Sequence, residues 1–322
     1  MPPQTARLSD SRRGVAPPRQ RLGPWELLRC VGQGTLCQVF RARPAGADRG
    51  AAYAVKLLVD RWNDDMAAIE VMRREVMVGR QVSHPHLIPI LSAQVGAAPH
   101  FIVMPWLEGS PLSTIIAAGR RLSVPAALWV VRQVAEALDA LHRHGWMHAD
   151  VKPSNVMVSS EGHATLIDLG FARQPADQTS LVDRCVAGTM HYVAPEMITS
   201  ALRPDIRSDL YSLGAMFYEV LCGRLPFVAR GLAELAEQHR QHEPPDLRTL
   251  APAVPPNVAN LVRSMLAKEP LRRPQTPREL VGRLVALEIE TFGQRRPMGF
   301  DNDNLADGSC RERTPCRSGN CD

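Results

Sequence analysis

Residues 148–155 restrict the possible folds of this chain more than any other stretch does. Their sequence, His-Ala-Asp-Val-Lys-Pro-Ser-Asn, places the carboxylate of Asp150, the amine of Lys152 and the amide of Asn155 within six residues. The stretch follows a helical pattern that begins at Ser123, and a short apolar run comes directly after it. Such chemistry at a helix-to-strand junction predicts an active-site loop. A plain turn is the alternative, because Asp, Asn, Pro and Ser all favour turns.

These eight residues resemble the catalytic loop of protein kinases. The resemblance implies that Asp150 lies beside the acceptor hydroxyl as it loses its proton, and that Asn155 holds a magnesium ion. It also implies that Lys152 neutralises charge on the transferring phosphoryl group. Phosphoryl transfer needs the two reacting oxygens to be aligned. It also needs positive charge around the negative charge that spreads over the phosphoryl group, and these residue types meet both needs.

The composition is that of an ordinary globular protein, with 322 residues, 45% of them apolar and 22% charged. This length allows one two-lobed unit or two domains. Part of the net charge of +5 lies in the first 21 residues, which hold five arginines and one aspartate. We interpret this segment as a basic tail, so direct nucleic-acid binding is not expected.

The seven cysteines are scattered and contain no Cys-x-x-Cys pair. This usage favours a reducing, cytoplasmic location over a disulfide framework. Neither an apolar leader nor an uninterrupted apolar run of membrane-spanning length is present, so no membrane span is expected. The last three cysteines, Cys310, Cys316 and Cys321, have spacings that suit no familiar zinc site.

Gly32 and Gly34 lie between two predicted strands, residues 25–31 and 38–42. Without side chains they let backbone amides approach a phosphate. The spacing resembles the glycine-rich loop of protein kinases, in which a third glycine would stand at Cys37. A hairpin turn is the alternative for two glycines taken alone.

Lys56 is the one charged residue in an otherwise apolar predicted strand, residues 51–59. Burying an unpaired charge is costly, so a partner is expected. A helical pattern over residues 64–82 supplies Glu75, with Glu70 as the competing candidate. The resemblance implies that Lys56 contacts the α and β phosphates of ATP and pairs with Glu75.

Gly79 follows Glu75 by one helical turn, where protein kinases usually carry a bulky apolar residue. Glycine cannot fill that space, and it costs about 1 kcal/mol of helix propensity relative to alanine. We therefore expect the packing that holds this helix inward to be weak at Gly79, and Gly79→Leu would test this.

Residues 88–91 and 101–104 are predicted to complete a five-stranded antiparallel sheet. Met104 aligns with the gatekeeper of protein kinases, and residues 105–107 align with the hinge that grips adenine. The residues expected to bind ATP are Val31, Gly32, Gln33, Gly34, Val39, Ala54, Lys56, Glu75, Met104, Pro105, Leu107 and Met157.

Asp168 ends an apolar run and begins Asp-Leu-Gly, which resembles the magnesium-binding Asp-Phe-Gly motif of protein kinases. The resemblance makes Asp168 a metal ligand together with Asn155, since a hard cation prefers oxygen. A plain Asp-Leu-Gly turn is the alternative for this motif in isolation.

The second half of the chain carries further kinase-like positions. Thr189 and Glu196 match the substrate-docking end of the activation segment in serine/threonine kinases. Asp209 is expected to anchor the backbone of the catalytic loop, and Arg273 is expected to pair with Glu196. An exposed Arg-Arg-Pro turn is the alternative for Arg273.

The resemblance covers about residues 24–290 and implies a two-lobed α+β fold. A small antiparallel sheet with one helix would precede a larger, mainly helical lobe. The predicted boundaries are a disordered basic tail (1–20), an N-lobe (21–105), a C-lobe (106–290) and a polar, cysteine-containing tail (291–322). Helices are predicted over residues 123–145, 231–242, 256–267 and 277–290.

The implied function is that of a serine/threonine protein kinase, which uses ATP and Mg²⁺ and acts on proteins, itself included. A pseudokinase scaffold without turnover is the main alternative, and a small-molecule phosphotransferase is a third. Ala149 replaces the arginine that usually collects an activation-loop phosphate. We therefore expect activity to depend little on phosphorylation of Thr179 or Ser180.

Overall fold

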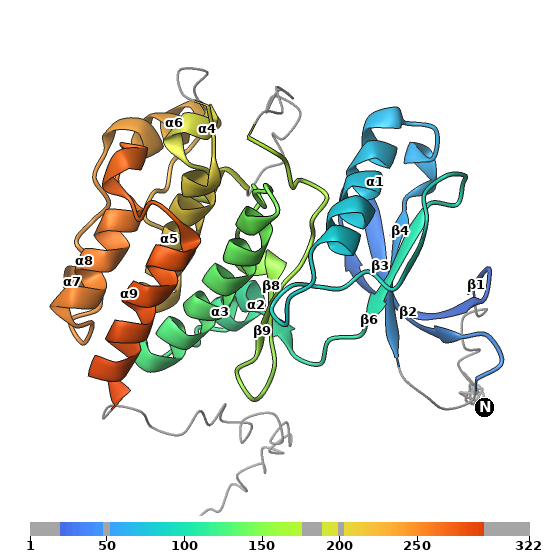
Figure 1. Cartoon of the computed structure of the whole chain (residues 1–322), viewed down its shortest axis with the longest axis horizontal. Coiled ribbons are helices and arrows are strands. Elements are labelled where there is room, and N and C mark those ends of the chain that lie inside the picture. Colours follow the sequence, from blue (N-terminus) through green and yellow to red (C-terminus); the bar gives the residue numbers. More distant parts are fainter. Residues whose placement is uncertain (1–19, 48–51, 176–188, 199–202, 293–322) are drawn as a thin grey trace, which may run out of the picture.

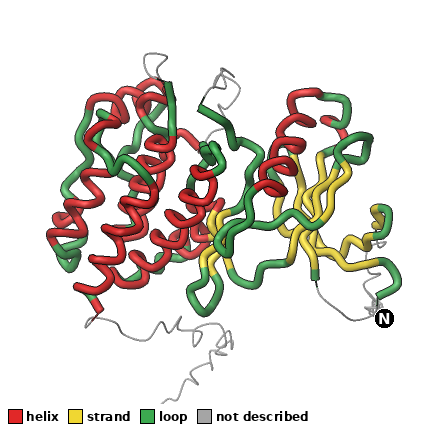
Figure 2. Tube along the Cα trace, in the orientation of Figure 1, coloured by secondary structure: helices red, strands yellow, loops and turns green. Residues whose placement is uncertain are grey.

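The computed structural model describes residues 20–47, 52–175, 189–198 and 203–292. In these ranges the chain forms a lobe built on a sheet and a larger lobe built from helices (Figure 1). Figure 2 shows the division clearly, with nearly all strands on one side of the molecule and most helices on the other. The predicted two-lobed α+β fold is therefore confirmed.

The first lobe contains a six-stranded antiparallel sheet with the strand order β1-β2-β3-β4-β6-β5. Helix α1 (Met66–Gln81) lies beside it, preceded by the 3-10 turn η1 (Asp60–Trp62). The strands are β1 (Gln20–Leu22), β2 (Trp25–Gln33), β3 (Cys37–Pro44), β4 (Tyr53–Leu58), β5 (Ser92–Gln94) and β6 (Phe101–Pro105).

The sheet differs from the prediction in two ways. It has six strands instead of five, because β1 pairs with β2 and begins one residue before the predicted N-lobe. The strand predicted at residues 88–91 does not form, and β5 follows it instead. The reason is that Ile88 donates its backbone N–H to Leu166 of the other lobe, so this apolar run connects the lobes.

Alternation along β4 and β6 gives the sheet two apolar faces. Val55 and Val103 belong to the cluster on one face, whereas Leu58, Ile102 and Met104 pack with the apolar side chains of α1 on the other. Lys56 is two residues from Leu58 along the same strand, so its side chain is on the α1 side.

A small sheet, β7 (Ser110–Pro111), β8 (Val156–Val158) and β9 (Ala164–Leu166), opens the second lobe. Its main helices are α3 (Val124–Arg143), α5 (Ile206–Cys222), α8 (Pro256–Met265) and α9 (Pro277–Glu290). The other helical pieces are α2 (Leu112–Ala117), η2 (Pro153–Asn155), η4 (Thr189–Tyr192), α4 (Pro195–Ile198), α6 (Leu232–Gln241), α7 (Leu247–Leu250) and η5 (Pro270–Arg272).

Side-chain caps start α3 and α9 where the sequence predicts a start. The side chains of Ser123 and Thr276 accept backbone N–H groups at the beginnings of α3 and α9. Asp205 does the same for α5, which ends at Gly223 with a left-handed backbone (φ 73°). Such caps satisfy amides that lack a partner within the helix. Residues of α3, α5, α8 and α9 share one large buried core, which fixes the loops at its edge.

Gly79 does not leave the gap that the sequence predicted. A Cβ atom added to Gly79 would overlap Cγ1 of Ile90, because Ile90 already occupies the space beside the helix. The prediction of unfilled space is therefore wrong, and Gly79→Leu would introduce a collision.

Among the residues that the structure describes, no helix has the length and apolar character needed to cross a bilayer.

Candidate active site

The core helix α5 anchors residues 148–155 through Asp209. His148 donates its backbone N–H to Asp209 Oδ2 at 2.6 Å, and Ala149 donates to Oδ1 at 2.7 Å. Burial raises the pKa of the Asp209 carboxyl, whereas these two amide donors and His148 oppose the rise. The predicted anchoring contact is present, and it ties the loop backbone to a helix whose residues are mostly buried.

Two non-glycine residues near the site have left-handed backbones, Ala149 with φ 61° and Asp168 with φ 69°. This conformation is strained for residues with a Cβ and persists only where the surroundings impose it. The Asp209 hydrogen bond imposes it at Ala149. The strained backbone immediately precedes Asp150, the carboxylate expected to meet the substrate.

Asp150 is buried and shares its carboxylate with two neighbours on the same loop. Lys152 Nζ lies 2.8 Å from Asp150 Oδ2, and Asn155 donates from Nδ2 to the same oxygen at 2.8 Å. Asn155 also donates to the backbone oxygen of Asp150 at 2.8 Å. The three polar residues singled out in the sequence therefore converge on one point.

Lys56 joins the two lobes through a pair of carboxylates. Its Nζ atom lies 2.6 Å from Glu75 Oε2 and 2.8 Å from Asp168 Oδ1. Glu75 is therefore the helix partner, and Glu70 instead pairs with Arg74 on the same helix.

The protonation states of this cluster follow from its charges. Burial would lower the pKa of the Lys56 ammonium, but Asp168 and Glu75 outweigh burial and raise it. Burial would raise the pKa of the Asp168 carboxyl, yet Lys56 more than offsets this and holds that pKa below its usual value. Lys56 is therefore a cation and Asp168 an anion at neutral pH.

A cavity of about 450 Å³ lies where these groups meet. Its size falls within the range of ordinary ligand sites. The predicted site residues that line it are Gly32, Gln33, Gly34, Val39, Lys56, Asp150, Lys152, Asn155 and Asp168.

The other residues predicted to bind ATP are not part of this lining. Ala54, Met104 and Leu107 pack with the apolar cluster beneath α1, and Glu75 pairs with Lys56. The last three residues predicted to bind ATP are Val31 on β2, Pro105 at the end of β6 and Met157 on β8. Their contact with adenine stays a prediction.

Five further residues that were not predicted as site residues also line the cavity: Thr35, Leu36, Val71, Ser154 and Phe171. Thr35, Leu36 and Ser154 lie within the glycine-rich and catalytic loops, so their position in these motifs could have predicted them. Val71 precedes Glu75 by four residues, and this helical spacing places it on the same face as Glu75.

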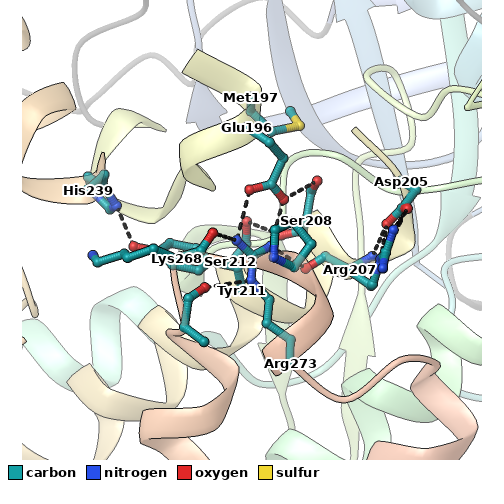
Figure 3. A network of polar contacts seen from close by, with 12 residues as sticks. Glu196, Met197, Asp205, Arg207, Ser208, Tyr211, Ser212, His239, Lys268 and Arg273 are labelled. Atoms are coloured by element: carbon teal, nitrogen blue, oxygen red, sulfur yellow. Dashed lines mark hydrogen bonds and ion pairs between the residues drawn. The ribbon is translucent and has the colours of Figure 1, made fainter. Parts of the chain in front are cut away.

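Glu196 and Arg273 form a buried, bidentate ion pair, as predicted (Figure 3). The two Nη–Oε distances are 2.6 and 2.8 Å, and the side chains are 3% and 0% exposed. Ser208 donates its hydroxyl to Glu196 Oε1 at 2.7 Å. Arg273 also donates to the backbone oxygens of Ala267, Arg207 and Lys268. An exposed turn at Arg273 is excluded.

Some predicted features lie outside the described residues. They are Thr179 and Ser180, the side chain of Thr189, the tail 1–19 and the tail cysteines Cys310, Cys316 and Cys321.

Cys37 lines the cavity with a thiol that burial makes a weak acid. Burial raises its pKa to about 11, despite the nearby Lys56 cation. Because the thiolate is the reactive form, only about one thiol in a thousand is reactive at pH 8. We expect iodoacetamide to alkylate Cys37 at least tenfold more slowly than the exposed Cys30 in the folded protein. Timed peptide mass spectrometry measures both rates, and equal rates would contradict this assignment.

Residues 25–283 match the family of the protein kinase domain. A probable serine/threonine-protein kinase of Clostridium perfringens is 31% identical over 260 residues, covering 81% of this chain and 38% of that protein. PrkC of Bacillus subtilis is 29% identical over 275 residues, covering 85% and 42%. PknD of Mycobacterium tuberculosis is 31% identical over 254 residues, covering 79% and 38%. The chain spans about two fifths of the length of these relatives.

Proposed function

The chain belongs to the protein kinase family, and from this premise we propose that it is a serine/threonine protein kinase. The reaction proposed is transfer of the γ-phosphoryl group of ATP to serine and threonine hydroxyls of proteins. The names of these relatives support the serine/threonine class.

The observation that carries the proposal is the meeting of Asp150, Lys152 and Asn155 with Lys56 and Asp168 around one cavity. In the proposed reaction, Asp150 accepts the proton of the acceptor hydroxyl. Lys152, 2.8 Å from Asp150, balances negative charge on the group in transfer. Lys56, held by Glu75, binds the phosphates that are not transferred.

Asp168 and Asn155 would hold the magnesium ion in this proposal. A carboxylate and an amide oxygen are the hard donors that Mg²⁺ prefers. No group of three His, Cys, Asp or Glu side chains within the described residues is arranged to hold a metal by itself. This fits Mg²⁺, which is commonly held by one or two carboxylates together with substrate phosphates and water. The ion would supply positive charge at the phosphates.

Phosphate transfer from labelled ATP tests the proposal directly. The protein is incubated with Mg²⁺, alone and with a generic basic protein, and the labelled amino acids are identified. We expect label on serine or threonine and its loss when EDTA removes Mg²⁺. A folded protein that binds ATP without transferring phosphate would overturn the proposal and favour a scaffold.

Activity is predicted to be nearly independent of Thr179 and Ser180. The residue before Asp150 is Ala149, which has no cationic side chain to bind a phosphate on the activation segment. We expect the double variant Thr179→Ala, Ser180→Ala to retain at least half of the wild-type rate on the basic protein. The control removes two serine hydroxyls elsewhere, in Ser159→Ala, Ser160→Ala. A tenfold loss confined to the first variant would show that phosphorylation matters.

A further inference from the structure

We propose that Lys268 is an acylation site, whose side-chain amine accepts the acyl group of a small activated donor, an acyl phosphate or a thioester. Lys268 is not among the residues that line the proposed ATP cavity, so this is a separate site. The proposal goes beyond phosphoryl transfer, because acylation of the amine does not depend on kinase activity. Only its expected effect on protein substrates rests on the proposed function.

Lysine is a rare residue in this chain. Lys56, Lys152 and Lys268 are its only lysines, whereas it has 35 arginines. Lys56 and Lys152 belong to the proposed catalytic cluster, where both pair with carboxylates. Arginine is permanently charged, but a buried lysine shifts its pKa readily and can then react as a nucleophile. Lys268 is therefore the one lysine whose presence the active site does not explain.

Two aromatic rings flank the amine of Lys268. Its Nζ atom lies 4.2 Å from the centroid of the Phe227 ring and 5.9 Å from that of the Tyr211 ring. It donates to the backbone oxygen of Gln238 at 3.4 Å. Within the part of the chain that the structure describes, no carboxylate forms an ion pair with it. The side chain is half-buried, so it is desolvated in part but still open to a small reagent.

The backbone of Lys268 is fixed by the buried ion pair of the large lobe. Arg273, which pairs with Glu196, donates to the backbone oxygen of Lys268 at 3.0 Å. Figure 3 shows the Lys268 side chain beside Tyr211, whose hydroxyl is 2.9 Å from Nδ1 of His239. The amine is thus presented from a rigid support, against rings that are themselves held in place.

This environment favours the neutral amine, which is the nucleophilic form. Burial lowers the pKa of the Lys268 ammonium to about 8, Glu243 opposes this fall and Arg273 adds to it. The face of the Phe227 ring favours the ammonium and limits the fall. At a pKa of about 8, roughly a quarter of the amine is neutral at pH 7.5, compared with about one part in a thousand for an ordinary lysine.

The groups that face Lys268 keep one charge state between about pH 7 and 9. Burial lowers the pKa of His239 to about 3, and burial raises the pKa of the Tyr211 phenol above its usual value. Carboxylates and guanidinium groups such as those of Glu243 and Arg273 keep their charge in this range. The pH dependence of acylation therefore reports on the Lys268 amine itself.

The acylation step needs only the amine and the donor. The neutral amine attacks the carbonyl carbon, and a carbon–nitrogen bond forms. The bond from this carbon to the phosphate oxygen or the thioester sulfur breaks, and the phosphate or thiolate leaves with the electron pair. The nitrogen gives one proton to water, so the product is a neutral amide. Acylation thus removes the positive charge that contacts the Phe227 ring.

Loss of this charge is expected to affect helix α6. Phe227 precedes α6 and Gln238 is near its end, and the Lys268 amine contacts both. Helix α6 lies against η4 and α4, which contain the predicted substrate-docking residues Thr189 and Glu196. We expect acylation to loosen α6 and to raise the KM for a protein substrate, while the KM for ATP stays unchanged.

Timed acetylation of the full-length protein tests the proposal. Folded protein is incubated with acetyl phosphate, and in parallel with an acetyl thioester, between about pH 6.5 and 10. Peptide mass spectrometry gives the rate at each lysine, and the same protein in urea gives the ordinary rate. Lys268→Arg is the matched control, because it keeps the positive charge without an amine that can be acylated.

We expect Lys268 to react at least about fivefold faster in the folded protein than in urea at pH 7.5, because more of its amine is neutral. Its rate in the folded protein should be half-maximal near pH 8, whereas the rate in urea should still rise at pH 10. Lys56 and Lys152 should react more slowly in the folded protein, since carboxylates hold their ammonium groups. Glu243→Gln should raise the rate at Lys268, since this carboxylate opposes the fall in pKa.

Reaction with either donor in this pattern supports the proposal, and the donor that reacts faster identifies the source of the acyl group. Equal rates in folded protein and in urea, or a folded-state rate that still rises at pH 10, would overturn it.

The effect on α6 is measured by comparing acetylated wild type with Lys268→Arg treated in the same way. We expect the KM for the basic protein to rise about threefold or more only in the wild type, with faster hydrogen exchange in residues 232–241. Unchanged KM and exchange would overturn the assigned effect. Absence of phosphate transfer by untreated wild type would count against the kinase proposal alone, because acetylation rates are measured without ATP.

Discussion

Replacing Asp150 with asparagine is expected to slow phosphoryl transfer by a factor of about 100 to 10,000, the usual contribution of a positioned acid-base group. Asparagine has nearly the same shape but cannot accept the proton of the acceptor hydroxyl. It also loses the charge that pairs with Lys152 at 2.8 Å. The loop itself should persist, because Asp209 holds its backbone independently of the Asp150 side chain.

The measurement is the initial rate of phosphate transfer to a generic basic protein, with ATP affinity and thermal unfolding measured on the same samples. Asp60→Asn is the matched control, since Asp60 is an exposed aspartate in η1, away from the cavity lining. We expect the control to keep the wild-type rate, and Asp150→Asn to bind ATP while losing transfer. A rate within threefold of wild type in Asp150→Asn would remove this residue from its proposed role.

Replacing Arg273 with alanine is expected to lower the free energy of unfolding by about 3–5 kcal/mol, the usual cost of removing one partner from a buried ion pair. The remaining Glu196 carboxylate would be buried, with only Ser208 as a hydrogen-bond donor among the contacts described above. Three backbone oxygens would also lose their donor. Chemical denaturation, followed by circular dichroism, measures the loss.

Arg272 provides the control because it is the adjacent arginine in a different environment. It pairs with Glu269 at 3.0 Å, but the two side chains are 73% and 66% exposed. Exposed pairs of this kind contribute at most about 1 kcal/mol, so Arg272→Ala should change stability little. The pair Glu196→Leu, Arg273→Met should be less harmful than Arg273→Ala alone, since it leaves no unpaired charge. Equal losses in Arg272→Ala and Arg273→Ala would contradict the assignment.

The polar contacts of the site were the most predictable part of the structure. A charge inside an apolar element requires an opposite charge nearby, so the sequence indicated that Lys56 needs a partner. The resemblance to protein kinases then implied Glu75 for Lys56 and Glu196 for Arg273, partners that lie 19 and 77 residues apart. The anchoring of the catalytic loop by Asp209 was predictable from its position in the motif.

The less predictable features depend on how elements fit together. Residues 88–91 are as apolar as a strand, and only the bond from Ile88 to Leu166 shows that they join the lobes. Gly79 suggested a gap because the position of Ile90 in space cannot be read from its position in the chain. The left-handed backbone of Ala149 likewise depends on hydrogen bonds to a residue 60 positions away.

The distance along the chain between Glu196 and Arg273 also has a consequence for how the protein is made. At about 5–20 residues per second, the ribosome adds Arg273 roughly 4 to 15 seconds after Glu196. During that interval the Glu196 carboxylate must stay in water, because burying it unpaired is costly. Strands β1 to β6 can pair during synthesis, since all of them lie before residue 106. The large lobe can close only after Arg273 has been added, so the active site between the lobes forms later than the sheet of the small lobe.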